Sequence, residues 1–178
     1  MSPRDPVAIL KAIEAACQEC TSALQRQPEA ANVWSGIAFR IGSSKLVAAL
    51  GEVLEVIDYP EITRVPRTQS WLLGIANMRG SLLPVIDLQS CLHGKTAPLT
   101  QKSRVLVIRQ NDVFSGLLVD EVLGIKYFTE TDIVESGIAV DAFLHPYVSH
   151  GYSKDRQCWG VFSISALTQA AGFLQVAV

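Results

Sequence analysis

The sequence predicts a mainly β protein built from two similar β-barrel subdomains in tandem, with a helix before them and a short helix after them. Three observations support this fold class. Short apolar runs separated by turn residues are typical of small barrels. The pattern changes from helical to strand-like after residue 32, and the strand region repeats itself. We therefore expect a helical extension over residues 1–28 and a β domain over residues 33–172.

An amphipathic helix is predicted for the extension. Asp5-Pro6 places a carboxylate at the N-cap and a proline at the first helical position, and Gln27-Pro28 ends the segment. Apolar side chains recur between these points at spacings of three and four residues, which forms a narrow stripe: Leu10, Ile13, Cys17, Cys20 and Leu24. The stripe could pack against the body of the protein or face a partner, and the sequence leaves both possibilities open.

The β region repeats with an offset of 69 residues, which places Glu52-Val53-Leu54 on Glu121-Val122-Leu123. Residues 34–57 align with residues 103–126 without a gap. Alternate apolar positions match in the same register, with Ile37 and Phe39 on Leu106 and Ile108. The repeat predicts two lobes and a final helix, at about 33–93, about 103–164 and 164–172.

Within the first lobe, strands are predicted at 34–41, 45–50 and 53–57, followed by a hairpin between residues 74 and 88. Residues 92–100 contain the turn formers expected of a connector. The second lobe continues with strands near Tyr147 and over 158–164, and the final helix stops at Gly172. Asp87 and Asp120 each end an apolar run, where a capping or turn role is expected.

Composition excludes several classes of function. The chain of 178 residues has a formal charge of −2, 7% aromatic residues and no basic cluster, which excludes a nucleic-acid binder. No apolar run approaches the ~20 residues that span a bilayer, and the first residues do not resemble a signal peptide, so we expect a cytoplasmic protein. Four cysteines in such a chain are expected to be thiols.

The most informative stretch is the hairpin, which reads Gly74-Ile-Ala-Asn-Met-Arg79-Gly80-Ser-Leu-Leu-Pro84-Val-Ile-Asp-Leu88. Gly80 can adopt the positive φ of a tight turn, which directs Arg79 towards water. Pro84 removes a backbone donor, so its strand is expected at a sheet edge or a bulge. This stretch closely resembles the signature of CheW-type adaptor domains, G-[VI]-x-N-[LM]-R-G-x-[ILV]-[ILV]-P-[VI]-[VI]-D-L. The resemblance covers roughly residues 34–167.

The resemblance implies two SH3-like, five-stranded barrels and a non-catalytic adaptor without a cofactor. CheW-type proteins couple methyl-accepting chemoreceptors to a CheA-type histidine kinase, and with its extension the chain is most similar to the adaptors of type IV pilus (twitching) systems. The resemblance also implies partner-binding residues, with Glu55 and Arg79 forming a pair: Val53, Glu55, Gly74, Arg79 and Val122. The expected partners are the kinase regulatory domain and the receptor tip, without insertion into the membrane.

The alternation of strand 53–57 adds Ile57 to the expected partner-binding residues. If Leu54 and Val56 point into the core, Val53 and Ile57 form an exposed apolar pair around Glu55. An exposed apolar pair of this kind predicts a partner. The alternative is that both faces of the strand are covered within the protein.

Enzyme and metal motifs are scarce. The three histidines lie in no metalloprotease, nucleophile-elbow or dinucleotide pattern, so we expect no enzymatic activity. The competing hypothesis is a cytoplasmic zinc or redox regulatory protein, because Cys17 and Cys20 have the C-x-x-C spacing and Cys91 and His93 could complete the site. Against this hypothesis, Cys17 and Cys20 also lie on the apolar stripe of the first helix.

Overall fold

The computed structural model describes residues 33–178, with the exception of residues 97, 111, 136, 174, 177 and 178. The predicted helix of residues 1–28 lies outside the described residues, as do Cys17 and Cys20. Residues 33–178 form one compact unit. None of its helices is both long and apolar enough to cross a membrane.

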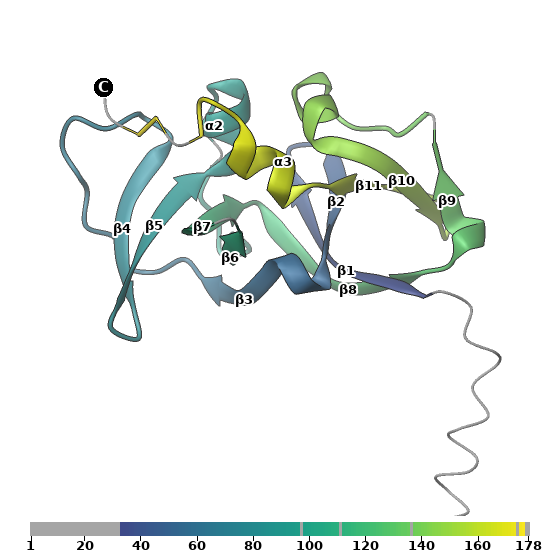
Figure 1. Ribbon diagram of the computed structural model, residues 1–178, viewed down its shortest axis with the longest axis horizontal. Helices are drawn as coiled ribbons and strands as arrows, with labels where there is room; N and C mark the ends of the chain where they lie inside the picture. Colours follow the sequence, from purple (N-terminus) through teal and green to yellow (C-terminus); the bar gives the residue numbers. More distant parts are fainter. Residues whose placement is uncertain (1–32, 97, 111, 136, 174, 177–178) are drawn as a thin grey trace, which may run out of the picture. The chain divides into compact units, whose positions relative to one another are not determined.

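The described residues form two β-sheets that lie next to each other, with helix α3 across their junction (Figure 1). The six-stranded sheet A has the order β8-β1-β2-β11-β10-β9 and contains β1 (Trp34–Ile41), β2 (Ser44–Ala49), β8 (Glu121–Phe128), β9 (Ile133–Val134), β10 (Val148–Lys154) and β11 (Gln157–Phe162). The five-stranded sheet B has the order β3-β6-β7-β5-β4 and contains β3 (Val53–Asp58), β4 (Leu72–Met78), β5 (Ser81–Asp87), β6 (Arg104–Gln110) and β7 (Val113–Val119). The helical elements are α2 (Leu88–His93), α3 (Ile164–Gln169) and the short 3₁₀ turns η1 (Leu50–Glu52), η2 (Glu130–Asp132) and η3 (Ala142–Tyr147).

The predicted mainly β fold with two subdomains is confirmed, but the strands of the subdomains are interleaved along the chain. β1 and β2 lie in sheet A, and the chain then crosses to sheet B for β3 to β7 before it returns. The sheets therefore do not follow the predicted lobe boundaries of 33–93 and 103–164. The repeat is nevertheless real, because each sheet combines the first two strands of one repeat with the later strands of the other.

The register of the strands supports this equivalence residue by residue. β3 pairs with β6 and β8 pairs with β1, and each pairing contains a bulge of one extra residue, at Leu54 and at Leu123. These two residues are 69 positions apart, as the sequence repeat requires. The parallel pairings correspond as well, since β11 lies beside β2 and β5 beside β7.

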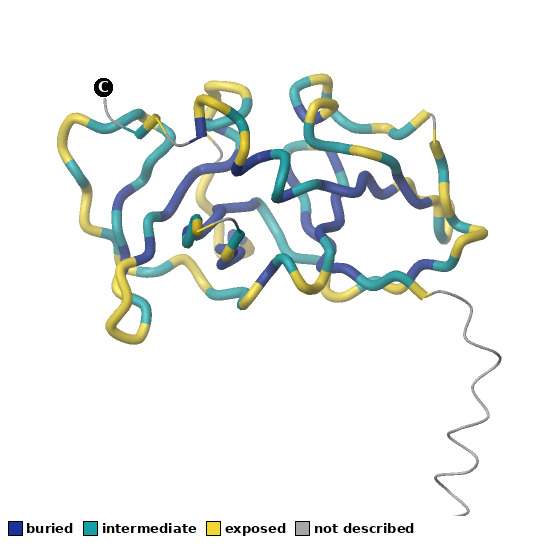
Figure 2. Tube along the Cα trace, viewed as in Figure 1, coloured by how far each residue is buried: buried dark blue, intermediate teal, exposed yellow. Residues whose placement is uncertain are grey.

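The strands at the junction of the two sheets are buried on both faces, which explains their nearly continuous apolar runs (Figure 2). In β1, Phe39 packs into a core shared by both sheets, whereas its neighbour Ala38 packs into a separate core of sheet A. In β6, Ile108 belongs to the shared core and Val107 to the core of sheet B. The shared core fixes the two sheets against each other.

Each of the two α-helices found among the described residues follows the last strand of a repeat and begins with a side-chain cap. The carboxylate of Asp87 accepts a hydrogen bond from the backbone N–H of Ser90, which confirms its predicted capping role at α2. Ser163 caps α3 in the same way.

The expectation that Pro84 marks a sheet edge or a bulge is wrong, because its strand β5 lies between β4 and β7 and Pro84 pairs regularly with Ile75. Pairing with β7 begins only at Val85, so no partner on that side needs the missing N–H.

Candidate protein-binding surface

The hairpin of β4 and β5 carries Arg79 at its tip. Arg79 and Gly80 both have positive φ values, 51° and 84°, as a tight two-residue hairpin turn requires. The backbone N–H of Gly80 donates a hydrogen bond to the side-chain oxygen of Asn77 (2.9 Å), which holds the turn. The sequence Asn77 to Gly80 thus fixes the position of Arg79 through local backbone chemistry.

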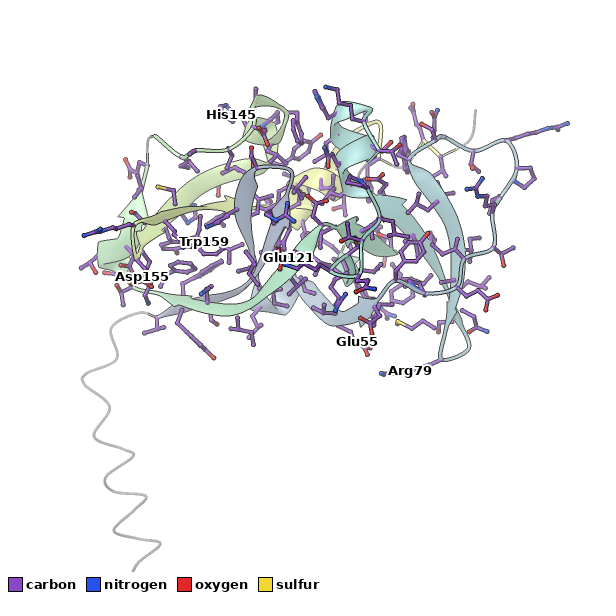
Figure 3. All side chains as sticks on the ribbon, turned by 180° about the vertical axis from the view of Figure 1, so that it is seen from behind. Glu55, Arg79, Glu121, His145, Asp155 and Trp159 are labelled. Carbon is purple, nitrogen blue, oxygen red and sulfur yellow. The ribbon has the colours of Figure 1, made fainter. Side chains whose placement is uncertain are left out.

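Arg79 and Glu55 form an ion pair of 2.8 Å, which confirms that these two residues come together (Figure 3). The Arg79 side chain is 78% exposed and that of Glu55 34% exposed. The pair joins the tip of the β4–β5 hairpin to β3, the other edge strand of sheet B. An ion pair this exposed adds at most about 1 kcal/mol to stability. Replacing either charge is therefore expected to leave the fold intact.

The expected exposed pair of Val53 and Ile57 is wrong. Val53 is only 7% exposed and belongs to the shared core, and Ile57 is half-buried against the core of sheet B. The bulge at Leu54 is the physical reason, because one extra residue shifts the alternation of the strand. Val53 and Val56 consequently both pack against the shared core, and Leu54 becomes 56% exposed beside Glu55.

Gly74 and Val122 are positions of structural importance. Gly74 is buried with φ 146°, and a Cβ there would lie 2.4 Å from both Ile62 Cγ2 and the Thr63 carbonyl oxygen. Only glycine lets the loop before β4 approach this strand. Val122 is half-buried against the shared core, at the position equivalent to Val53.

Two exposed leucines were missed by the sequence analysis. Besides Leu54, Leu82 in β5 is 69% exposed while its neighbour Leu83 is fully buried. The Leu82-Leu83 dipeptide in a strand contains the signal that one leucine must face outwards, since successive side chains alternate. These leucines place exposed apolar surface on the two strands that carry and flank the ion pair.

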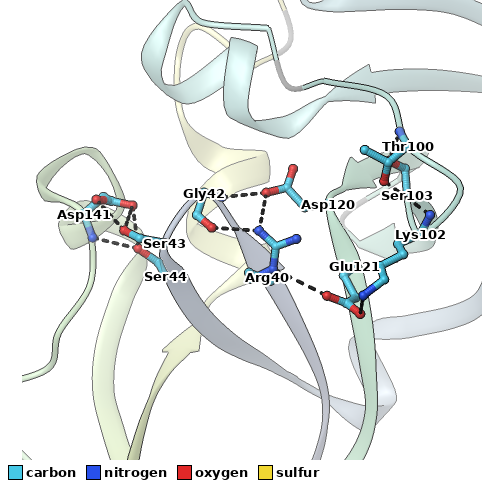
Figure 4. A network of polar contacts seen from close by, with 10 residues as sticks. All are labelled: Arg40, Gly42, Ser43, Ser44, Thr100, Lys102, Ser103, Asp120, Glu121 and Asp141. Atoms are coloured by element: carbon cyan, nitrogen blue, oxygen red, sulfur yellow. Dashed lines mark hydrogen bonds and ion pairs between the residues drawn. The ribbon is translucent and has the colours of Figure 1, made fainter.

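A second polar network holds the crossing from β7 to β8 (Figure 4). The carboxylate of Asp120 accepts hydrogen bonds from the Arg40 guanidinium (3.1 Å) and from the backbone N–H of Gly42 (2.8 Å). Glu121 lies near Arg40 and near Lys102, with N–O separations of 3.6 and 3.3 Å. Asp120 therefore has the turn role expected from the sequence, and the network ties the two sheets together.

The metal and redox hypothesis finds little support in the part of the chain that the structure describes. No three potential ligands among His, Cys, Asp and Glu come together there. Burial, reinforced by the charge of Asp87, raises the pKa of the Cys91 thiol to about 11, so Cys91 is protonated at neutral pH and a poor ligand. His93 stacks on Phe143, with ring centroids 4.7 Å apart.

Comparison with known proteins identifies the family. A family model described as the CheW-like domain matches residues 35–172. The chain belongs to the CheW-like family. Members of this family are non-catalytic scaffold adaptors of chemosensory signalling. The family membership expected from the hairpin signature is thus confirmed.

Individual CheW-like proteins resemble the chain over different lengths. Protein PilI of Pseudomonas aeruginosa is 43% identical over 173 residues, which cover 97% of each chain. Chemotaxis protein CheW of Helicobacter pylori is 31% identical over 116 residues, 65% of this chain and 70% of the other. The crystal structure of the scaffolding protein TtCheW from Thermoanaerobacter tengcongensis superposes with a TM-score of 0.67 at 24% identity, and the match covers 78% of this chain and 94% of that one.

Proposed function

We propose that this CheW-like chain couples methyl-accepting chemoreceptors to a CheA-type histidine kinase, in the array that controls type IV pilus twitching motility. The similarity to PilI over nearly the full length supports the choice of system. The proposal places the chain in the cytoplasm, attached to receptor arrays through its partners. The observation that carries the docking surface is the exposed Glu55–Arg79 pair beside the exposed Leu54.

In this proposal each residue class has a different task. Leu54 and Leu82 supply apolar contact area and affinity. Glu55 and Arg79 restrict the orientation of the partner, because opposite charges at fixed positions penalise other orientations. Val53 and Val122 have a structural task in the shared core, and Gly74 allows the loop before β4 to approach its strand.

Two kinds of partner need two kinds of contact. A receptor tip is a helical hairpin, which suits packing of an apolar helix face into a groove. A kinase regulatory domain of similar fold suits contact between one subdomain and another, and such heterologous contacts can close into rings. The adaptor then transmits a signal through the geometry of binding and without a chemical step.

The test is the charge reversal Arg79→Glu in the full chain, with co-purification of receptor and kinase from the native cell. We expect loss of both partners with an unchanged thermal unfolding midpoint, because the tip charge contributes little to stability. Arg156→Glu is a matched control, since Arg156 lies at the tip of the equivalent β10–β11 hairpin with a positive φ of 59°. A folded Arg79→Glu protein that recovers both partners at the wild-type level would refute the assigned surface.

The swapped pair Glu55→Arg with Arg79→Glu sharpens the result. If the two residues act mainly by holding each other, the double variant regains binding. If Arg79 contacts an acidic group of the partner directly, binding stays lost although the intramolecular pair is restored.

A further inference from the structure

The loop between β3 and β4, residues 59–71, is long for a connection in a compact domain, and loops of more than about 12 residues usually carry a function. Thr63 and Ile75 exchange two backbone hydrogen bonds of 2.9 Å, which fixes the middle of the loop to β4. The Thr68 hydroxyl donates to the carbonyl oxygen of Val65 (2.9 Å). The loop therefore presents its side chains from a fixed backbone.

A hollow of about 350 Å³ lies against this loop. Its polar wall contains a guanidinium, an amide and three hydroxyl groups, from Arg64, Gln69, Thr68, Ser70 and Thr96. Its apolar wall contains three aliphatic side chains, those of Val65, Leu72 and Leu73. No carboxylate is among the described residues that line the hollow. A guanidinium beside hydroxyl groups that can donate hydrogen bonds is an arrangement that binds phosphate groups.

The charge around the hollow is positive. Arg64, Arg67 and Lys95 are exposed, and none forms an ion pair with another described residue. Glu61 lines a neighbouring hollow with Arg64 but does not pair with it. Asp58, at the end of β3, is paired with Arg104 (3.2 Å). An incoming anion thus meets cations that are not already neutralised.

Arg67 has a φ of 59°, in the left-handed region that costs a residue other than glycine about 1 kcal/mol. The hairpin-tip residues Arg79 and Arg156 have the same conformation, so at Arg67 it marks a sharp turn of the chain. Arg67 directly precedes Thr68 of the hollow, so the strained turn sets the direction of the chain at the polar wall.

We propose that this hollow binds a small soluble phosphate monoester. The phosphate accepts hydrogen bonds from Arg64 and from the hydroxyls of Ser70 and Thr96, and the organic part lies against the aliphatic wall. The Thr68 hydroxyl donates its proton to Val65 and holds the turn beside the site. The site is at the start of β4, whereas the Glu55–Arg79 pair is at its end, about 20 Å away along the strand. The ligand therefore binds without occupying the proposed docking surface.

The test is an amide NMR titration of the full chain at constant ionic strength, first with inorganic phosphate and then with a nucleoside 5′-monophosphate. We expect saturable shifts centred on Thr68, Gln69, Ser70 and Thr96, with tighter binding of the ester because of its additional apolar contact. Arg64→Gln should weaken both affinities by about tenfold or more, since a charge-assisted hydrogen bond is lost. Arg109→Gln removes an exposed arginine that stacks on Phe114 and serves as the matched control.

Three outcomes would overturn the proposal. Shifts that do not saturate by about 10 mM, or that spread over the whole surface, would leave only non-specific ion binding. Equal affinities of the wild type and Arg64→Gln would remove Arg64 from the site. A phosphoserine peptide that binds more tightly than the nucleotide would assign the hollow to a phosphorylated protein. We expect the Arg64→Gln variant to co-purify receptor and kinase at the wild-type level. Failure of the phosphate proposal can therefore be distinguished from failure of the proposed adaptor function.

Discussion

The two repeats of this chain have the same internal architecture and different surfaces. Both place a bulge at the same position of the edge strand, at Leu54 in β3 and at Leu123 in β8. In sheet B the hairpin tip reaches the edge strand through Arg79 and Glu55, two side chains that a partner can contact. In sheet A the equivalent hairpin reaches β8 through Lys154, which donates to the backbone carbonyl of Tyr127 (2.6 Å).

The connections that precede the two hairpins also differ, in the sign of their charged residues. The loop of residues 59–71 contains Arg64 and Arg67 against a single acidic residue, Glu61. The equivalent connection, residues 129–147, contains four acidic residues: Glu130, Asp132, Glu135 and Asp141. A duplicated framework therefore holds two chemically different ends, and the partners and ligands that we propose depend on this difference.

The largest effect is expected from separating the repeats. Fragments 33–98 and 99–178 each lack strands that their own strands pair with, because β3 pairs with β6 and β1 with β8. We expect neither fragment to unfold cooperatively alone, and the two together to regain the β-sheet signal in circular dichroism and a cooperative thermal transition. A fragment that folds by itself would show that the subdomains are independent units.

A smaller effect distinguishes the two residues at the bulge. Val53→Ala should lower the free energy of unfolding by about 2 kcal/mol, because it removes buried methyl groups from the shared core. Leu54→Ala should change it by no more than about 0.5 kcal/mol and should instead reduce recovery of partners. Chemical denaturation and co-purification measure the two quantities. The reverse ranking would contradict the position of the bulge.

The smallest effect concerns Glu52 and Glu121, which are equivalent in the sequence repeat. Burial raises the pKa of the Glu52 carboxyl, although backbone hydrogen bonds at Ile164, Ala49 and Ser165 oppose the shift. Glu121 lies instead beside Arg40 and Lys102.

Between the unfolded and folded pKa values of Glu52, the folded chain binds more protons than the unfolded chain. The contribution of Glu52 to the stability of the wild type is therefore fully present below pH 4.5, which is the ordinary pKa of the carboxyl. This contribution is lost as the pH rises through the pKa of the folded state. The difference in melting temperature between Glu52→Gln and the wild type should accordingly rise with pH in favour of the variant. A difference in melting temperature between Glu52→Gln and the wild type that does not change with pH would contradict the effect of burial on the Glu52 carboxyl.

Much of the fold and part of the site could be predicted from local patterns. The strands and the repeat follow from apolar runs and turn residues, and the position of Arg79 follows from the tip Asn77 to Gly80. The pairing of Glu55 with Arg79 came from resemblance to a family, because residues so far apart in sequence carry no local signal of contact. The exposure of Leu54 could not be predicted, since the one-residue bulge that causes it depends on the neighbouring strand β6.

The sequence alone determined the class of fold, its duplication and its family, because burial periodicity and turn chemistry are properties of short segments. Only the tertiary structure decided that the strands are exchanged between the two sheets, which buries Val53 and exposes Leu54. It also decided that Arg64 and Thr96, from two separate connections, line one hollow. These outcomes depend on which strands pair across long sequence distances, and that choice is made by the shared core as a whole.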